Sequence, residues 1–438
     1  MIWNRSILAL GTAEIASNLG SRMTWLALPW FVLVTSGSAT RMGIVFAVEA
    51  VPLALLGIPS GAVVQRLGAR TTMLACDLAR APLVALMPLL HALHALPFAV
   101  LLGLVFLAGV FTAPYFASQR LVLPEVVGED ERSVTQANSL IEGAQRLTGL
   151  AGPAAAGALI SVLGAPNVIW IDAATYALAF VLVALFVPRR APTPAAVEAC
   201  GLLAGLRFLA RDPLLGPIAV EIVLVGLFVP LLFAGLPLLA FERYGRSALV
   251  AGALASAWSG GALLGAAAAY RVAKRSSPLR IAIFAAPWFA LPIWTLVFAT
   301  PAWAAVSALA VSGLAVPFLN APIIALLTMR TPQALRGKVM TATSTAEIST
   351  APVSYALTGP AFAGLGLAGT YVLVAGGLSA SMAILVRILV RASARRPSPR
   401  RSPRSARPRT EARRPCCRSA DLAAGRFRDG SRTGSRAP

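Results

Sequence analysis

Residues 97–118 read PFAVLLGLVFLAGVFTAPYFAS, an apolar run without a single charged side chain. An α-helix needs roughly 20 predominantly apolar residues to cross the ~30 Å hydrocarbon layer of a membrane. The run lacks the strict alternation of apolar and polar residues that a strand of a membrane barrel shows. This stretch therefore predicts a transmembrane helix.

Eleven further apolar segments follow the same pattern. The chain is 57% hydrophobic and 13% charged, whereas about 25% of the residues in a soluble domain are charged. We predict an all-α membrane protein with twelve transmembrane helices. They lie near residues 6–34, 42–63, 72–94, 97–118, 138–163, 167–187, 214–240, 247–270, 279–299, 302–326, 339–362 and 366–390.

The loops between these segments predict the orientation. Loops that follow even-numbered segments carry 15 Lys and Arg residues, whereas the opposite loops carry only Arg41, Arg243 and Arg246. Short basic loops remain on the cytoplasmic side. We expect a multi-pass protein in the cytoplasmic (plasma) membrane of a bacterium, with both termini in the cytoplasm.

An internal repeat divides the chain into two halves. The pairs, 204 or 205 residues apart, are Gly57 and Gly261, Gly61 and Gly265, Arg66 and Arg271, Ala137 and Ala342, and Glu142 and Glu347. Two halves of equal orientation are the parallel-repeat plan of a transporter that works by alternating access. We predict six-helix halves at residues 1–187 and 214–390, joined by a cytoplasmic linker, 188–213, that contains a short interfacial helix.

Residues 391–438 differ from the rest of the chain. They hold 15 Arg and three acidic residues, so much of the net charge of +21 lies there. Such a composition predicts a disordered basic cytoplasmic tail. It is either simply solvated or attracted to anionic lipid. Nucleic-acid binding is not expected, because interleaved aromatic residues are lacking.

The loop after the second segment carries a family resemblance. Gly57, Gly61, Gln65-Arg66, Gly68 and Arg70 resemble the signature loop of the major facilitator superfamily. The likeness continues at 27–30, at Asp77 and Arg80, and at 120–125, 136–138 and 335–340, and it covers about residues 5–390. Together these motifs resemble the efflux branch that includes macrolide-efflux and enterobactin-exporter-like proteins.

The resemblance implies a gating role for Gly61, Gln65, Arg66, Gly68 and Arg70, although the two arginines are equally compatible with simple topology anchoring. The acid of the family's signature is Gln65 here, so a charged lock is reduced to a neutral hydrogen bond.

The fifth segment contains a second motif. Gly149, Gly152, Pro153 and Gly157 are similar to the Gly-Pro motif of the superfamily's antiporters, which implies a hinge; a purely structural kink is the alternative. Glu142 and Arg146 lie one helical turn apart near its cytoplasmic end. We expect these two to form a structural or gating pair.

Ionisable residues inside spans are expensive and are functional candidates by default. Glu14, Asn18 and Arg22 share one face of the first segment. They either neutralise one another or contact the substrate or protons. Glu49, Glu221 and Glu347 have no basic partner one turn away. These three acids are candidates for proton coupling, because removal from water disfavours a charged carboxylate. Asp77, Arg80 and Asp172 are expected to be structural.

The combined prediction is a secondary active transporter that exports small hydrophobic or amphipathic molecules by alternating access, with protons as the coupling ion. Its expected partners are a small-molecule substrate, protons and the lipid bilayer, and it is expected to be a monomer. No cofactor, metal site or catalytic residue is predicted. The alternatives are a membrane enzyme that acts on a lipid-linked substrate and a non-transporting sensor that keeps a transporter fold.

Overall fold

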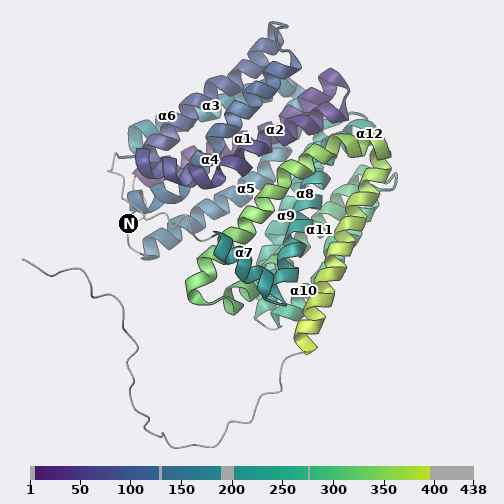
Figure 1. Cartoon of the computed structure of the whole chain (residues 1–438). Coiled ribbons are helices and arrows are strands. Elements are labelled where there is room, and N and C mark those ends of the chain that lie inside the picture. Colours follow the sequence, from purple (N-terminus) through teal and green to yellow (C-terminus); the bar gives the residue numbers. More distant parts are fainter. Residues whose placement is uncertain (1–4, 128–130, 189–201, 275–276, 395–438) are drawn as a thin grey trace, which may run out of the picture. The chain divides into compact units, whose positions relative to one another are not determined.

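The computed structural model describes residues 5–127, 131–188, 202–274 and 277–394, and within these ranges the regular structure is entirely helical (Figure 1). The prediction of an all-α protein is confirmed. Part of the predicted linker and nearly all of the predicted tail lie outside the described residues.

The helices follow the apolar segments closely. They are α1 (Arg5–Ser36), α2 (Ala39–Leu67), α3 (Ala69–Ala92), α4 (Phe98–Val127), α5 (Glu131–Leu163), α6 (Ala165–Phe186), α7 (Leu202–Arg211), α8 (Leu215–Arg243), α9 (Ala248–Ala273), α10 (Pro278–Ala290), the 3₁₀ helix η2 (Leu291–Leu296), α11 (Ala302–Arg330) and α12 (Gln333–Ala394).

The helix ends have local causes in the sequence. The hydroxyl groups of Ser38 and Ser247 accept hydrogen bonds from main-chain N–H groups in the first turns of α2 and α9, as N-cap residues do. Helix α12 is interrupted at Gly366, whose φ of 67° and ψ of −178° are not helical. The chain therefore turns there, between the last two predicted spans.

Ten of these helices are long and apolar enough, by length and composition, to cross a membrane. One of the ten is the 57-residue stretch that contains the break at Gly366. Helix α1, 32 residues long, is not among them. The predicted number of twelve would require α1 and each arm of α12 to cross the membrane separately, and it stays a prediction.

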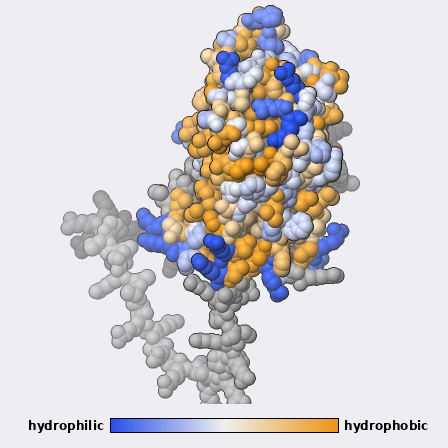
Figure 2. Space-filling view, turned by 90° about the vertical axis from the view of Figure 1, so that its right-hand side faces the viewer, coloured by the Kyte–Doolittle hydropathy of each residue, from blue (hydrophilic) through white to orange (hydrophobic). Residues whose placement is uncertain are grey.

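The surface also suits a lipid environment. Large apolar side chains such as Val162, Phe284 and Trp303 are more than 70% exposed. Hydrophobic side chains cover much of the face in Figure 2, and hydrophilic ones gather along its lower edge and in a patch near its upper end. Exposed apolar area on this scale is unfavourable in water and favourable against lipid tails.

The helices pack as two sets with two lines of contact between them. Helix α1 packs against α5 and α6, and α3 packs against α4 and α6. In the second set, α8 packs against α12, and α11 packs against α9 and α10. The sets meet where α2 lies against α12 and where α5 lies against α9.

Both lines of contact lie at one end of the helices. A buried apolar cluster there joins the ends of the first six helices, for example at Phe31, Leu101 and Val168, to Ala240 and Ala251 of α8 and α9. We call this end of the helices the Gly366 end, after the loop in α12. At the opposite end, called the Gly68 end, the corresponding cluster contains residues of α1–α4 and α6 and the residue after α6.

Glycines make the close approach at the Gly366 end possible. A Cβ atom on Gly43 of α2 would lie 2.7 Å from the main-chain nitrogen of Gly359 in α12. A Cβ atom on Gly157 of α5 would lie 2.6 Å from the carbonyl oxygen of Ala248 in α9. Small residues let membrane helices pack backbone to backbone. These two contacts form what we call the glycine seam.

Candidate functional site

The polar stripe of α1 divides into a buried and an exposed part. Glu14 is 2% exposed, and its carboxylate accepts hydrogen bonds from Gln119, from Asn18 over 3.2 Å and from Tyr115 over 3.5 Å. Arg22 is exposed and, among the described side chains, forms no ion pair with Glu14. Glu14 is thus held by neutral donors, two of them from α4.

A cavity of about 300 Å³ lies against this stripe. We call it the N-cavity, because α1, α2, α3, α4 and α6 supply most of its wall. Its polar lining residues are Ser17, Asn18, Ser21, Arg22, Thr24, Glu49, Arg80, Thr112 and Asp172, and its aromatic ones are Trp25, Phe46, Tyr115, Phe116, Tyr176 and Tyr355. The predicted candidates Asn18, Arg22 and Glu49 therefore share one cavity.

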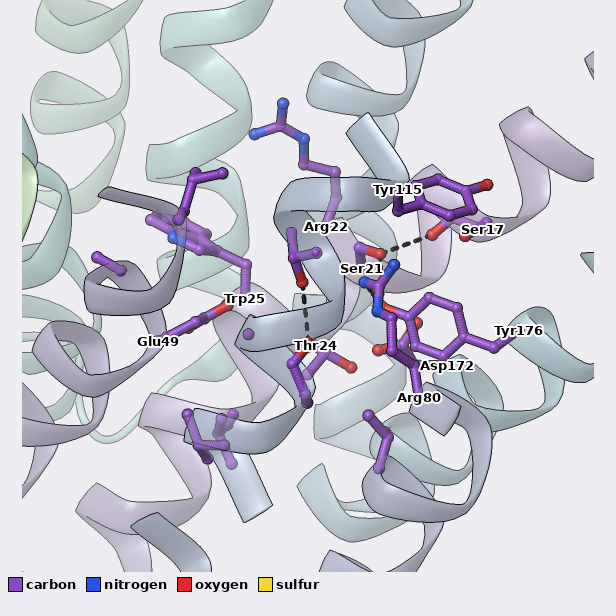
Figure 3. A pocket seen from close by; sticks show the side chains of 18 of the residues that line it. Ser17, Ser21, Arg22, Thr24, Trp25, Glu49, Arg80, Tyr115, Asp172 and Tyr176 are labelled. Atoms are coloured by element: carbon purple, nitrogen blue, oxygen red, sulfur yellow. Dashed lines mark hydrogen bonds between the residues drawn. The ribbon is translucent and has the colours of Figure 1, made fainter. Parts of the chain in front are cut away.

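One wall of the N-cavity carries a buried cation between two tyrosines. Arg80 is 7% exposed and donates a hydrogen bond to the Tyr176 hydroxyl group. Its guanidinium carbon lies 4.0 Å from the centroid of the Tyr176 ring and 5.5 Å from that of Tyr115. The Tyr176 hydroxyl group also lies 2.8 Å from the Ser21 hydroxyl group. Figure 3 shows Arg80, Asp172 and Tyr176 close together.

Several buried atoms in this wall, and on Asp77 one turn before Arg80 in α3, lack a hydrogen-bond partner among the described residues. They are both carboxylate oxygens of Asp77, Nε of Arg80 and Oδ2 of Asp172. Buried polar groups normally have partners, and those that do not require an explanation such as water, an ion or a functional role. Because Arg80 and Asp172 line the cavity, its contents can reach this group.

The opposite wall is aromatic and joins the two helix sets. The rings of Trp25 and Phe46 lie 5.7 Å apart, and Phe46 stacks on Tyr355 of α12 at 5.2 Å. Trp25 also meets Phe233 of α8 edge to face. Glu49 lies beside Trp25 on this side of the cavity (Figure 3). The N-cavity is therefore bordered by both sets.

The other two acidic candidates lie in a second cavity of about 300 Å³, which we call the C-cavity. Glu221 of α8 is 2% exposed, whereas Glu347 of α12 is exposed. Both line this cavity together with residues of α9, α10 and α11. The structure thus separates the six candidates into an N-terminal and a C-terminal group.

Helix α5 carries the glycines and the proline of the predicted hinge without a helix break at any of them. Gly157 is in the glycine seam, and a Cβ atom on Gly152 would overlap the side chain of Arg22. Gly149 faces Ser259 of α9 at ordinary contact distance. Glu142 and Arg146 form an exposed ion pair of 3.8 Å.

The predicted gating loop lies at the Gly68 end. Gly68 has a φ of 82° and stands between α2 and α3. A Cβ atom on Gly61 would meet nothing within 4 Å. Gln65 is half-buried and Arg66 is exposed, whereas Arg70 donates hydrogen bonds to the carbonyl groups of Ala184 and Val187 at the end of α6.

The wall around Arg80 was not among the predicted site residues, since Asp77, Arg80 and Asp172 were expected to be structural. The sequence held one usable signal. Asp172 and Tyr176 are one turn apart in an otherwise apolar segment, as Asp77 and Arg80 nearly are in another. Two polar pairs on two apolar helices indicate that these side chains face one another inside the protein and not the lipid.

Comparison with known proteins agrees with this architecture. The chain is 31% identical over 229 residues to the multidrug efflux pump Tap of Mycolicibacterium fortuitum, which covers 50% of this chain and 56% of that protein. It is 30% identical over 166 residues to the staphyloferrin A transporter of Staphylococcus aureus, covering 37% of this chain and 41% of that one. The chain spans about half the length of the curated relatives it matches.

Solved structures share the fold at low sequence identity. The nucleoside transporter NupG superposes with a TM-score of 0.73 at 12% identity, covering 87% of this chain and 98% of that one. A bacterial homologue of the iron transporter ferroportin, in an inward-facing state, gives a TM-score of 0.70 at 12% identity over 89% and 99%. Residues 10–347 match the sequence profile of the Major Facilitator Superfamily, and the chain belongs to this family.

Proposed function

We propose that this transporter exports small hydrophobic or amphipathic molecules by alternating access and takes up protons in exchange. Proteins of this superfamily are transporters and not enzymes, so the membrane-enzyme alternative is dropped. The multidrug efflux pumps among the relatives support export as the direction. The sensor alternative is decided by the experiment below.

The observation that carries the proposal is the N-cavity behind the glycine seam. Helices α2 and α12 and helices α5 and α9 are closed at the Gly366 end, whereas Gly61 near the Gly68 end has open space around it. From these contacts and the predicted orientation we infer a state closed to the outside and open to the cytoplasm. A substrate would enter the N-cavity from the cytoplasm and leave when the seam parts.

The lining of the N-cavity suits an amphipathic substrate. Trp25, Phe46 and Tyr355 offer flat apolar faces, Glu49 offers a carboxylate beside them, and Arg80 and Asp172 offer charged groups on the opposite wall. Ligand cavities commonly combine an apolar lining with a few placed polar groups. The size of about 300 Å³ is at the lower end of the usual range for small-molecule sites.

Glu49 is our choice for the proton-coupling group. It lines the cavity, is half-buried, and has no hydrogen bond or ion pair within the described part of the chain. A carboxylate in such a place can exchange a proton for a substrate, because burial disfavours its charged form.

The division into halves at 1–187 and 214–390, with a linker at 188–213, belongs to the same proposal.

Expression in an efflux-deficient bacterial host tests the function. The chain should raise resistance to a subset of hydrophobic or amphipathic compounds in a screen across chemical classes. Glu49→Gln should abolish the resistance, and Glu242→Gln, an exposed acid at the end of α8, should keep it. No resistance from a protein that is present and folded in the membrane would favour the sensor.

A further inference from the structure

The C-cavity has an unusual balance of charge. Among the residues that the structure describes, its lining has two carboxylates, from Glu221 and Glu347, and no Lys, Arg or His side chain. The N-cavity, by contrast, is lined by Glu49 and Asp172 together with Arg22 and Arg80. The two cavities therefore present different electrostatic surroundings to a solute.

Glu221 is the buried member of the pair and forms no ion pair with any side chain of the described residues. It is 2% exposed, and the hydrogen bond given to it within the described ranges comes from Ser381, at 3.5 Å to Oε1. Its Oε2 has no partner there. A buried carboxylate without a cation or a full set of donors is expensive. A ligand in the cavity can supply the positive charge or the donors that this carboxylate lacks.

The equivalent carboxylate in the first half of the chain, by contrast, does have a set of hydrogen-bond donors. Glu221 lies 207 residues after Glu14, close to the period of the repeat, and both are 2% exposed acids in the first helix of a half. Glu14 accepts hydrogen bonds from Asn18, Tyr115 and Gln119. The protein therefore satisfies one of the two equivalent carboxylates internally and leaves the other facing a cavity.

The remaining lining is aromatic and sulfur-rich. Trp258 and Phe289 both line the C-cavity and hold each other edge to face, with ring centroids 5.6 Å apart. Met340 and Met382 complete the apolar wall. Aromatic faces attract organic cations, and methionine side chains adapt to irregular ligands.

We propose that the C-cavity is a binding site for organic cations with an apolar body, such as quaternary or protonated amines, with Glu221 as the charge partner. The inference rests on the proposed function in that it names a substrate class for this transporter. It assigns the positive charge of the ligand to Glu221 and the apolar body to the wall around Trp258.

The test measures binding to the purified full chain by equilibrium dialysis. The probes are phenyltrimethylammonium and 2-phenyl-2-propanol, which have similar shapes and differ in charge. The wild type should bind the cation at least about tenfold more tightly, since its positive charge is attracted to the carboxylate of Glu221 and this attraction is stronger where water is excluded. Glu221→Gln should lose this preference and still bind the neutral compound.

Two further variants locate the effect. Glu221→Asp keeps the charge and should retain a preference for the cation. Glu242→Gln, on the same helix but outside the cavity, should behave like the wild type. A preference that survives Glu221→Gln, or disappears in Glu242→Gln, would overturn the proposal, as would a wild type that does not distinguish the probes. Transport is not needed for this assay, so failure of the proposed function would be seen separately.

Discussion

The guanidinium group of Arg70 donates a hydrogen bond from Nε to the main-chain carbonyl oxygen of Val187 over 2.6 Å. A second bond, from Nη2, reaches the carbonyl oxygen of Ala184 over 2.8 Å. A cation at the end of a helix satisfies free carbonyl groups and complements the helix dipole. Arg70 therefore ties the start of α3 to the end of α6 within the first helix set, while Arg66 is exposed.

This contact predicts that the two arginines of the loop contribute differently to stability. Arg70→Leu should destabilise the folded protein by about 1.5–3 kcal/mol, the usual worth of hydrogen bonds to a charged group. Arg66→Leu should change it by less than about 0.5 kcal/mol. Thermal unfolding of the purified protein in detergent compares the two. Equal unfolding temperatures would show that the Arg70 contact contributes little.

The neutral residue at Gln65 predicts a conformational effect. An acid at this position should favour closure of the Gly68 end by roughly 0.5–2 kcal/mol, as a carboxylate near a helix N-terminus does. In Gln65→Asp, spin labels at the exposed positions Thr71 and Gln333 should therefore gain a population of shorter distances. An unchanged distance distribution at matched pH would mean that Gln65 is not a weakened lock. The gating role of Arg66 would then be withdrawn.

Two glycines on different helices should respond in opposite ways to a large side chain. Gly157→Leu should open the glycine seam, because the new side chain would meet the backbone of α9. Labels at the exposed residues Val162 and Leu249 should move apart. Gly61→Leu fits the present state but should obstruct closure at the Gly68 end and slow transport.

Gly103→Leu is the control for Gly61, because Gly103 is exposed on α4 and its Cβ position is also open. This variant should transport normally. If Gly61→Leu transports as well as Gly103→Leu does, then α2 does not approach the second helix set at this end during transport.

The orientation has its own test. In a variant without the native cysteines, single cysteines at Ser38, Asn167 and Gly366 should react with a membrane-impermeant thiol reagent added outside intact cells. A cysteine at Ala334 should not react. Labelling at Ala334 from outside would mean that the orientation is the opposite one. The open end would then face the outside and not the cytoplasm.

The fold was largely predictable from the sequence because each span is a local property. Apolar runs, the Gly366 turn and the short linker helix α7 are read within short windows, and most helices begin and end within a few residues of the predicted limits. Helix α4 runs nine residues past its predicted end, and α5 begins seven residues before its predicted start. The ninth predicted span, at 279–299, differs in form. Its α-helix ends at Ala290 and continues as 3₁₀ turns to Leu296, where Pro292 provides no N–H for an α-helical bond.

The candidate site was less predictable because it depends on contacts between distant helices. The spacing of Glu14, Asn18 and Arg22 correctly places them on one helix but does not show which neighbours they meet. Gln119 and Tyr115, more than 100 residues away, bond to Glu14. Likewise, Asp172 meets Arg80 only through the packing of α3 against α6. Helix rotation and pairing decide such contacts, and one sequence does not specify them.

The central claim, export driven by proton exchange through the N-cavity, is tested most directly in proteoliposomes loaded with acidic buffer. The substrate is a compound to which the chain confers resistance, and the lumen carries a pH-sensitive dye. The account predicts that substrate enters only while the gradient lasts and that the lumen becomes less acidic as it does. Glu49→Gln should abolish gradient-driven uptake but retain exchange of substrate for substrate. Uptake that is independent of the pH gradient, or equal in Glu49→Gln, would contradict proton exchange at this cavity.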